Sequence, residues 1–446
     1  MSHAYEAKKQ RLTQNLRVYR GESIRLGKTT SNLFRDRRQV PARSLDVRDF
    51  NDVLSVDVAN GVVEVEGMTT YVKLVAECLK NNVLPAVVPQ LKSITIGGAT
   101  AGCGIESSSF RYGLVHETVR EMEILLSDGR TVLCTPDNEH RDLFYGFPNS
   151  YGTLGYALKL KAMVVSVKQF VKLTHLQYSD PQVYFAELSR YCDDKEIDFI
   201  DGVVFDRSRM VLTIGQFTDD APYTSDYTYK KIYYKSLLER SEDFLTTEDY
   251  IWRWDTDWFW CSKNLYAQNP IIRRVYGRPR LNSITYTKIM RWNSRWKLSQ
   301  VLDKLLGVHA ESVIQDVEIP VDHAHEFLSF YHDKIQFMPI WICPTRAYNP
   351  NVVYDLYRMD PKKLYINFGF WDVIRGRQNL APGFYNRMIE EKVISLGGMK
   401  SLYSDSYFSP DQFWKIYNKP MYDRLKKKYD PDGMFKDIYR KCVFKE

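Results

Sequence analysis

The chain of 446 residues contains no uncharged apolar run long enough to span a bilayer, and its first residues lack the apolar core of a signal peptide. We therefore expect a cytoplasmic protein, at most peripheral to a membrane. Cysteine is also scarce: seven residues without a C-x-x-C pair argue against a disulfide framework or a cysteine zinc site and favour a reducing compartment. Glycine and proline are at ordinary levels and 44% of the residues are hydrophobic, which predicts a globular chain.

Several nucleotide and metal motifs are incomplete. A P-loop has four residues between its glycines, but five separate Gly21 from Gly27. Residues 102–107 begin like the dinucleotide fingerprint G-x-G-x-x-G, yet Ser107 replaces the third glycine. The three histidines between 323 and 332 do not share one helix face, and no hydrolase triad has a local signature. The sequence therefore predicts no metal site and no P-loop nucleotidase.

Positive charge is concentrated in an N-terminal arm. Residues 1–48 hold 12 Lys/Arg but only 4 Asp/Glu, a net charge of +8, whereas the whole chain carries +7. Leu12, Leu16 and Val18 interrupt this arm without helical regularity. The arm is interpreted either as a solvated segment partly docked on the protein or as a peripheral contact with an anionic membrane. We expect no nucleic-acid partner.

The first 165 residues combine antiparallel strands with few helices, which predicts an α+β fold. Strands are expected over 62–66, 83–88 and 157–165, and Asp128-Gly129 predicts the turn of a hairpin over 121–135. Thr69 or Thr70 precedes a predicted helix, whose apolar stripe is Val72, Val75, Ala76 and Leu79.

The pattern of predicted elements and the aromatic content of the sequence change near residue 170. Strands are predicted over 203–205, 210–214, 313–320 and 364–370, with a helix after Asp322. Thirteen aromatic residues lie between 223 and 266. They are interpreted either as core packing or as a lid over an apolar substrate.

Small side chains dominate the segment 95–109. Its four glycines, at 97, 98, 102 and 104, allow a ligand to approach the backbone closely. Backbone N–H groups and neighbouring hydroxyls suit a pyrophosphate. The alternative is a tight turn packed under another element.

The order of motifs over 62–165 resembles the PCMH-type FAD-binding (vanillyl-alcohol oxidase) family. The motifs are a VEVEG strand, a helix, L-P-x-x-V-P, the glycine segment, R-Y-G, the hairpin, D-L-F and Y-G-T-L-G. Within this family the chain is similar to the Diminuto/24-dehydrocholesterol reductase branch, the Δ24-sterol reductases. The segments that carry this similarity are 104–109, 269–271, 315–320, 339–344 and 402–405.

The resemblance implies a two-lobed FAD-binding domain and an α+β substrate (cap) domain over a mainly antiparallel sheet. The expected divisions are a flavin domain with its arm (1–170), the cap domain (171–400) and a C-terminal segment returning to the flavin domain (401–446). FAD is expected to be non-covalent, since residues 24–34 contain no histidine. The implied FAD-binding residues are Thr95, Ile96, Gly97, Gly98, Ala99, Thr100, Ala101, Gly102, Cys103, Gly104, Ile105, Glu106, Ser107, Tyr112, Gly113, Gly152, Thr153, Leu154 and Gly155.

The implied reaction is reduction of an isolated C=C bond in a sterol-like, apolar substrate, with NADPH as the electron donor and hydride delivered from flavin N5. Such a bond also needs a proton donor. Strand alternation places Asp316 and Glu318 on one face, and Asp316 is the first candidate acid. Tyr403 and Asp405 are the next candidates, followed by Tyr407. Trp341 either borders the substrate or belongs to the core.

Two other functions stay open. An FAD oxidase or dehydrogenase acting on a sugar or polyprenyl-linked alcohol would use the same fold in the opposite direction. A binding module without catalysis is the third possibility. The sequence does not determine the oligomeric state.

Overall fold

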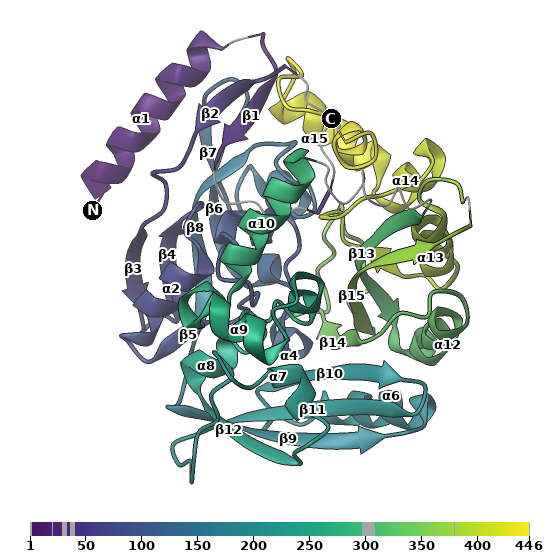
Figure 1. The fold of residues 1–446 in the computed structure, drawn as a ribbon. Helices are drawn as coiled ribbons and strands as arrows, with labels where there is room; N and C mark the ends of the chain where they lie inside the picture. The colour runs from purple at the N-terminus through teal and green to yellow at the C-terminus, as the bar shows by residue number, and fades with distance from the viewer. Residues whose placement is uncertain are drawn as a thin grey trace.

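A computed structural model describes residues 2–19, 21–28, 34–35, 41–296, 308–378 and 380–445. Besides a two-stranded pair near the N-terminus, the chain forms a smaller sheet from its first part and a larger sheet from its middle part (Figure 1). The last helices return to the smaller sheet, so the fold is α+β with mainly antiparallel sheets. No described helix is both long enough and apolar enough to cross a membrane.

The smaller sheet has the order β3-β4-β8-β6-β7, and β5 pairs with β8. The predicted strands 62–66 and 157–165 and the predicted hairpin are confirmed, and Gly129 in the hairpin turn has a φ of +84°. The strand predicted over 83–88 ends early because the Ala86 carbonyl accepts a bond from Ser108 Oγ. The bounds are β3 (Val53–Asp57), β4 (Val62–Glu66), β5 (Val83–Pro85), β6 (Val119–Leu125), β7 (Thr131–Cys134) and β8 (Tyr156–Ser166).

Helix α2 (Tyr71–Leu79) lies where it was predicted, but it buries a different stripe. Its buried side chains are Tyr71, Leu74, Val75 and Cys78. Val72 and Ala76, predicted to face the core, are exposed. The two stripes have the same i, i+3, i+4, i+7 spacing and differ by one residue, and the large Tyr71 ring packs inward. The other helices beside this sheet are α3 (Ile96–Ala101), α4 (Ser109–Tyr112) and α5 (Arg141–Gly146).

The larger sheet has the order β12-β9-β11-β10-β14-β15-β13-β16. The strands predicted over 203–205, 210–214, 313–320 and 364–370 lie within it and are confirmed. Its bounds are β9 (Phe170–Tyr178), β10 (Phe199–Asp206), β11 (Arg209–Thr218), β12 (Glu242–Thr246), β13 (His309–Pro320), β14 (Ile340–Arg346), β15 (Leu364–Gly376) and β16 (Met399–Lys400).

Strand alternation gives the larger sheet two different faces. Ile340 and Ile342 of β14 belong to one core, which three helices cover, whereas Trp341 and Cys343 belong to the core shared with the smaller sheet. The covering helices are α6 (Pro181–Tyr191), α12 (Ala324–Lys334), which confirms the helix predicted after Asp322, and α13 (Phe384–Ser395). Side chains on the face that these helices leave uncovered therefore point toward the smaller sheet.

The aromatic-rich segment and the residues that follow it form four α-helices of the described chain between β11 and β13. They lie at the front of the molecule in Figure 1. Trp254 and Trp260 are fully buried, which fits the core-packing interpretation, whereas Trp258 and Phe259 line a cavity described below. The helices are α7 (Tyr233–Ser236), α8 (Thr247–Ile251), α9 (Pro270–Tyr276) and α10 (Ser283–Trp296).

The N-terminal arm is more regular than the sequence predicted. Residues Ser2–Val18 form the helix α1, which buries Tyr5, Leu12 and Leu16. The turn between Tyr5 and Leu12 presents Lys8 and Lys9 to the protein, where they pair with Glu66 and Glu123 at 2.8 Å. Lysines thus occupy the positions where an apolar stripe would continue, which hid the helical period. The arm continues in β1 (Ile24–Gly27), which pairs in parallel with β2 (Arg43–Asp46); residues 29–33 lie outside the described residues.

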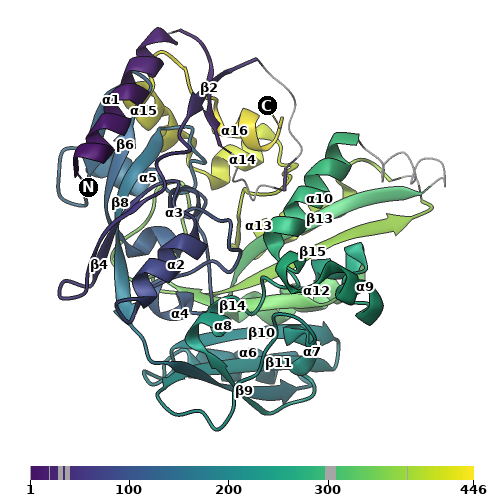
Figure 2. The ribbon, with the colours of Figure 1, turned by 60° about the vertical axis from the view of Figure 1, so that its left-hand side comes forward.

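The C-terminal segment packs against the smaller sheet (Figure 2). Lys426 Nζ donates to the Thr153 carbonyl at 2.9 Å, and Lys441 Nζ donates to the Tyr151 carbonyl at 2.6 Å. The helices are α14 (Pro410–Ile416), α15 (Lys419–Tyr429) and α16 (Ile438–Cys442). The domain limits at 170 and 400 stay predictions.

Candidate functional site

A cavity of about 260 Å³ lies between the two sheets. The glycine segment and the turn at 151–157 form one wall. Asp316, Trp341 and Trp371 from the uncovered face of the larger sheet line the other wall, together with Tyr403. The structure therefore brings the predicted FAD segment and two predicted catalytic residues to one pocket.

The glycine segment begins with the short helix α3, whose glycines and alanines face the cavity. Thr95 caps α3, and its Oγ1 accepts a bond from Gly98 N at 3.3 Å. The backbone at Gly67 packs closely against this helix, since a Cβ on Gly97 would lie 2.7 Å from the Gly67 carbonyl oxygen. Of the predicted FAD-binding residues, those that line the cavity are Thr95, Gly97, Gly98, Ala99, Ala101, Gly102, Cys103, Gly104, Ile105, Glu106, Gly152 and Gly155.

The other predicted FAD-binding residues lie behind this wall. Ser107 Oγ is 3.0 Å from the Tyr250 hydroxyl, and Thr100 Oγ1 donates to the Ile96 carbonyl at 2.9 Å. Gly113 ends α4 with a φ of +72°. The residues outside the cavity lining are Ile96, Thr100, Ser107, Tyr112, Gly113, Thr153 and Leu154.

The cavity wall fits a flat, polar cofactor with a phosphate chain. From Gly97 to Gly102 its lining side chains are no larger than a methyl group, so backbone groups are accessible to a ligand. A Cβ on Gly98 would meet only Thr95 Oγ1, at 2.9 Å. Gln90 also lines the cavity, and its buried Oε1 has no hydrogen-bond partner among the described residues. This segment could hold the pyrophosphate and ribityl chain of FAD.

Asp316 faces the cavity on β13. Its Oδ1 accepts a bond from Asn367 Nδ2 at 3.2 Å, and the Tyr403 hydroxyl is its second polar neighbour. The hydroxyl in turn accepts a bond from Trp371 Nε1 at 2.8 Å. Removal from water raises the pKa of Asp316 to about 6, although both hydrogen bonds lower it. The carboxyl therefore keeps its proton up to about pH 6, well above the pH at which an ordinary aspartate ionises.

Glu318 shares the face of Asp316, as predicted, but it does not line the cavity. Its side chain is fully buried and accepts a bond from the Tyr357 hydroxyl. Burial, followed by the nearby Asp316 charge, raises the pKa of Glu318 to about 8. A neutral Glu318 adds no charge that would oppose ionisation of Asp316.

Asp405 lies outside the cavity lining. Its carboxylate is 2.9 Å from Lys445 Nζ, and its carbonyl accepts a bond from Lys400 Nζ at 2.7 Å. The Tyr407 ring packs against Gly383, also away from the cavity. Of the candidate acids predicted after Asp316, only Tyr403 reaches the pocket.

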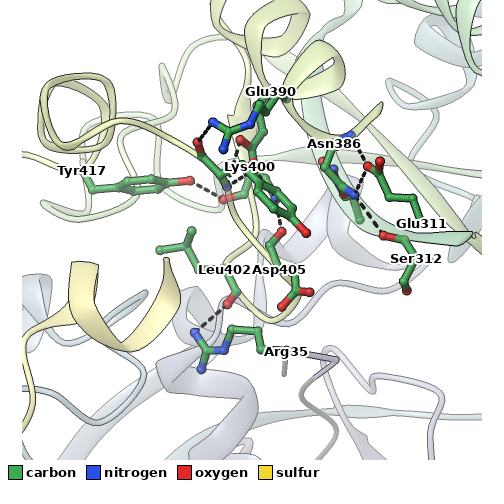
Figure 3. A network of polar contacts seen from close by, with 12 residues as sticks. Arg35, Glu311, Ser312, Asn386, Glu390, Lys400, Leu402, Asp405 and Tyr417 are labelled. Carbon is green, nitrogen blue, oxygen red and sulfur yellow. Dashed lines mark hydrogen bonds and ion pairs between the residues drawn. The ribbon is translucent and has the colours of Figure 1, made fainter. Parts of the chain in front are cut away.

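A buried ion pair fixes the segment that carries Tyr403 (Figure 3). Lys400 Nζ lies 2.5 Å from Glu390 Oε1, and both side chains are almost completely buried. The Tyr417 hydroxyl donates to the Lys400 carbonyl at 2.7 Å, and Arg35 Nη1 donates to the Leu402 carbonyl at 2.9 Å. Contacts from Glu390, Tyr417 and Arg35 therefore fix the backbone on the N-terminal side of Tyr403.

A second buried charge cluster connects the glycine segment with the larger sheet. Arg253 Nη2 is 2.7 Å from Asp201 and 3.5 Å from Glu106, and Trp341 Nε1 donates to Asp201 at 3.2 Å. Burial raises the pKa of Glu106 to about 7, opposed by the Arg253 charge. The cluster fixes the Trp341 ring beside the cavity.

Sequence reasoning missed several residues of the site. Gln90, Trp258, Phe259 and Trp371 line the cavity, and Arg253 stands behind it. The aromatic density between 223 and 266 was the only available signal for the two residues at 258 and 259. No local pattern marks Gln90 or Arg253, because their partners are distant in sequence.

Comparisons with known proteins agree with this geometry. A family model described as an FAD binding domain matches residues 19–135, which include the glycine segment. The Delta(24)-sterol reductase of Homo sapiens is 28% identical over 403 residues, covering 87% of this chain and 76% of the relative. The Delta(24)-sterol reductase of Arabidopsis thaliana is 26% identical over 433 residues, covering 89% and 76%. Since the similarity extends far beyond the matched domain, the comparisons support an FAD-dependent oxidoreductase that is similar to the Delta(24)-sterol reductases over most of its length.

Proposed function

We propose that the protein reduces an isolated C=C bond of a sterol-like lipid, with NADPH as the source of electrons. The observation that carries this proposal is a carboxyl of raised pKa, Asp316, in an aromatic cavity opposite the glycine segment. The cavity rings are those of Trp258, Phe259, Trp341 and Trp371. They offer a largely apolar surface of the kind that binds a rigid hydrocarbon skeleton.

Bound FAD would supply hydride from its N5 atom. The chain must then place the alkene, exclude water and deliver a proton to the second carbon. Asp316 is suited to hold that proton, because burial favours its neutral form. Asn367 and Tyr403 contact the carboxyl and would orient it toward the cavity.

The alternative is oxidation of a sugar or polyprenyl-linked alcohol. A sugar site would carry several polar side chains able to bind hydroxyl groups. The wall around Asp316 instead carries the rings of Trp341 and Trp371, and the described lining residues include one lysine, Lys28, but no histidine. The wall therefore favours the lipid alkene over the sugar.

Peripheral membrane contact through residues 1–48 stays a prediction. In its described part, α1 turns Tyr5, Leu12 and Leu16 inward and leaves Val18 exposed, and Lys8 and Lys9 are paired with acidic residues. Arg11 is exposed but pairs with Asp49, so among the described residues of the arm a membrane contact would depend mainly on the exposed Arg17 and Arg25.

The decisive experiment is anaerobic reduction of the flavin by NADPH, followed by mixing with Δ24-unsaturated sterols. Bleaching by NADPH and recovery of the flavin colour on mixing are the expected results. If an alcohol reduces the flavin and no Δ24 sterol reoxidises it, the oxidase interpretation replaces the reductase.

We expect FAD to be bound without a covalent bond. The matched domain indicates FAD, and the described part of 24–34 places no histidine beside the cavity. Acid precipitation of the purified protein should release the yellow colour into the supernatant. Colour retained in the pellet would contradict the prediction.

Gly98→Val and Gly102→Val should weaken FAD binding roughly 10- to 100-fold, the range expected from overpacking by about 1–3 kcal/mol. At Gly98 the new side chain would meet little protein and would project into the cavity. FAD content is measured by absorbance, and folding by circular dichroism. Gly376→Val is the matched control, since no atom lies within 4 Å of a Cβ there. Full FAD content in both cavity variants would place the cofactor elsewhere.

A further inference from the structure

The segment from Trp258 to Trp296 contains eight Lys/Arg and no Asp or Glu. Part of this charge is neutralised within the protein. Lys263 pairs with Asp372 at 2.7 Å, Arg273 pairs with Asp257 at 2.6 Å, and Arg278 pairs with Asp226. Arg274, Arg280 and Lys288 are exposed, so this surface is positively charged.

Large apolar side chains are exposed on the same segment. Tyr266, Ile271 and Val275 are 73–76% exposed, and Trp292 is 56% exposed. A single exposed apolar side chain is ordinary, but a group of them within 27 residues marks an interaction surface.

The exposed side chains follow the periods of two helices. On α9, Ile271, Arg274 and Val275 occur at i, i+3 and i+4. On α10, Ile284, Lys288 and Arg291 are spaced by four and three residues, and Trp292 follows. Each helix thus mixes apolar and basic groups on its outer side. The helices touch through Tyr276 and Tyr286, whose ring centroids are 6.4 Å apart, and both lie on the outside of the molecule in Figures 1 and 2.

The inner side of α10 supports the cavity wall. Tyr286 is fully buried and stacks on Trp258, with an interplanar angle of 7° and a centroid distance of 6.4 Å. Trp258 lines the cavity. At the start of α10, the Ser283 hydroxyl bonds to Asp255. The exposed surface and the cavity are therefore separated by one helix and one ring.

We propose that the outer face of α9 and α10 docks on a lipid bilayer that contains anionic headgroups. Lys and Arg beside Trp, Ile and Val are the composition of an interfacial helix, in which cations bind headgroups and apolar side chains enter the boundary region. A protein partner would typically carry acidic residues opposite so many cations, but its binding would not depend on lipid. The docking surface is defined as Ile271, Arg274, Val275, Lys288, Arg291 and Trp292.

The purpose of this surface rests on the proposed function. A sterol-like substrate resides in the bilayer, and docking beside the cavity shortens its path through water. The docking itself can be tested without flavin chemistry, so its failure and the failure of the proposed reaction are distinguishable.

The test is flotation of the whole protein with vesicles. Vesicles of phosphatidylcholine mixed with phosphatidylserine should float the wild type, whereas pure phosphatidylcholine should float much less of it. Arg274→Gln/Lys288→Gln/Arg291→Gln should lower binding to the mixed vesicles by at least about tenfold, since each cation near the surface contributes about 1 kcal/mol. Ile271→Ser/Val275→Ser/Trp292→Ser should lower binding to both kinds of vesicle.

The matched control removes three exposed charges from the arm, in Arg11→Gln/Arg17→Gln/Arg25→Gln. This variant should float like the wild type. Equal loss of binding in the arm variant would overturn the assignment to α9 and α10 and favour the arm. Absence of wild-type flotation would also overturn it, as would a dimer in light scattering that the serine variant alone dissociates. NADPH-driven bleaching should be unchanged in the serine variant, which checks that the flavin site is intact.

Discussion

Asp316→Asn should leave NADPH-driven bleaching of the flavin nearly intact and slow sterol-driven reoxidation by roughly 10²- to 10⁴-fold, the usual contribution of a positioned acid. Only the second half-reaction places a proton on carbon. Asn keeps the size of Asp and can still contact Asn367 and Tyr403, but it has no acidic proton. Stopped-flow absorbance measures the two half-reactions separately.

The pH dependence provides an independent check. The pKa of Asp316 is raised to about 6, so its carboxyl is protonated below that pH and ionised above it. Reoxidation by the wild type should therefore fall as the pH rises through about 6. In Asp316→Asn this step in the profile should disappear.

The exposed Asp322, which follows the same strand, offers a matched control in Asp322→Asn. That variant should keep both rates. Equal slowing of both half-reactions in Asp316→Asn would indicate a structural role for the carboxyl. Unimpaired reoxidation would transfer the role of acid to Tyr403, which Tyr403→Phe would then test.

Lys400→Met should lower the free energy of unfolding by about 3–5 kcal/mol, because it leaves the buried Glu390 carboxylate without its cation. Both side chains are at most 2% exposed, and burial already raises the pKa of Glu390. Urea unfolding followed by fluorescence measures the loss. Glu390→Gln/Lys400→Met should recover much of it, since the double variant has no unpaired buried charge.

An exposed pair gives the reference for this measurement. Lys419 and Asp423 lie 2.5 Å apart, but their side chains are 50% and 54% exposed. Lys419→Met should therefore cost no more than about 1 kcal/mol. If Lys400→Met and Lys419→Met lowered the free energy of unfolding by similar amounts, the buried pair would not be what holds the segment before Tyr403.

Local patterns predicted those parts of the site that depend on neighbours in the chain. The glycine segment was recognisable because small side chains are needed along the whole run, and the face of Asp316 followed from the period of a strand. On α2 the period was correct but the stripe was displaced by one residue, since hydrophobicity alone does not show that Tyr71 turns inward.

The sequence did not reveal those residues whose partners lie far away in the chain. Arg253 is buried because Asp201 and Glu106 approach it from 52 and 147 residues away. The helix α1 was missed because Lys8 and Lys9 replace apolar residues on its inner side. Their acidic partners, Glu66 and Glu123, lie on strands of the smaller sheet. Such residues look like ordinary surface charges until the fold brings their partners together.

The bonds from Lys441 to Tyr151 and from Lys426 to Thr153 also set the order of events during synthesis. They close the turn beside the cavity with groups that are up to 290 residues later in the chain. A ribosome adds about 5–20 residues per second, so the nascent glycine segment waits roughly 15 to 60 s for these contacts. During that interval the first domain lacks part of its own surface. We therefore expect the capture of FAD to be completed only at the end of translation, when these contacts can form.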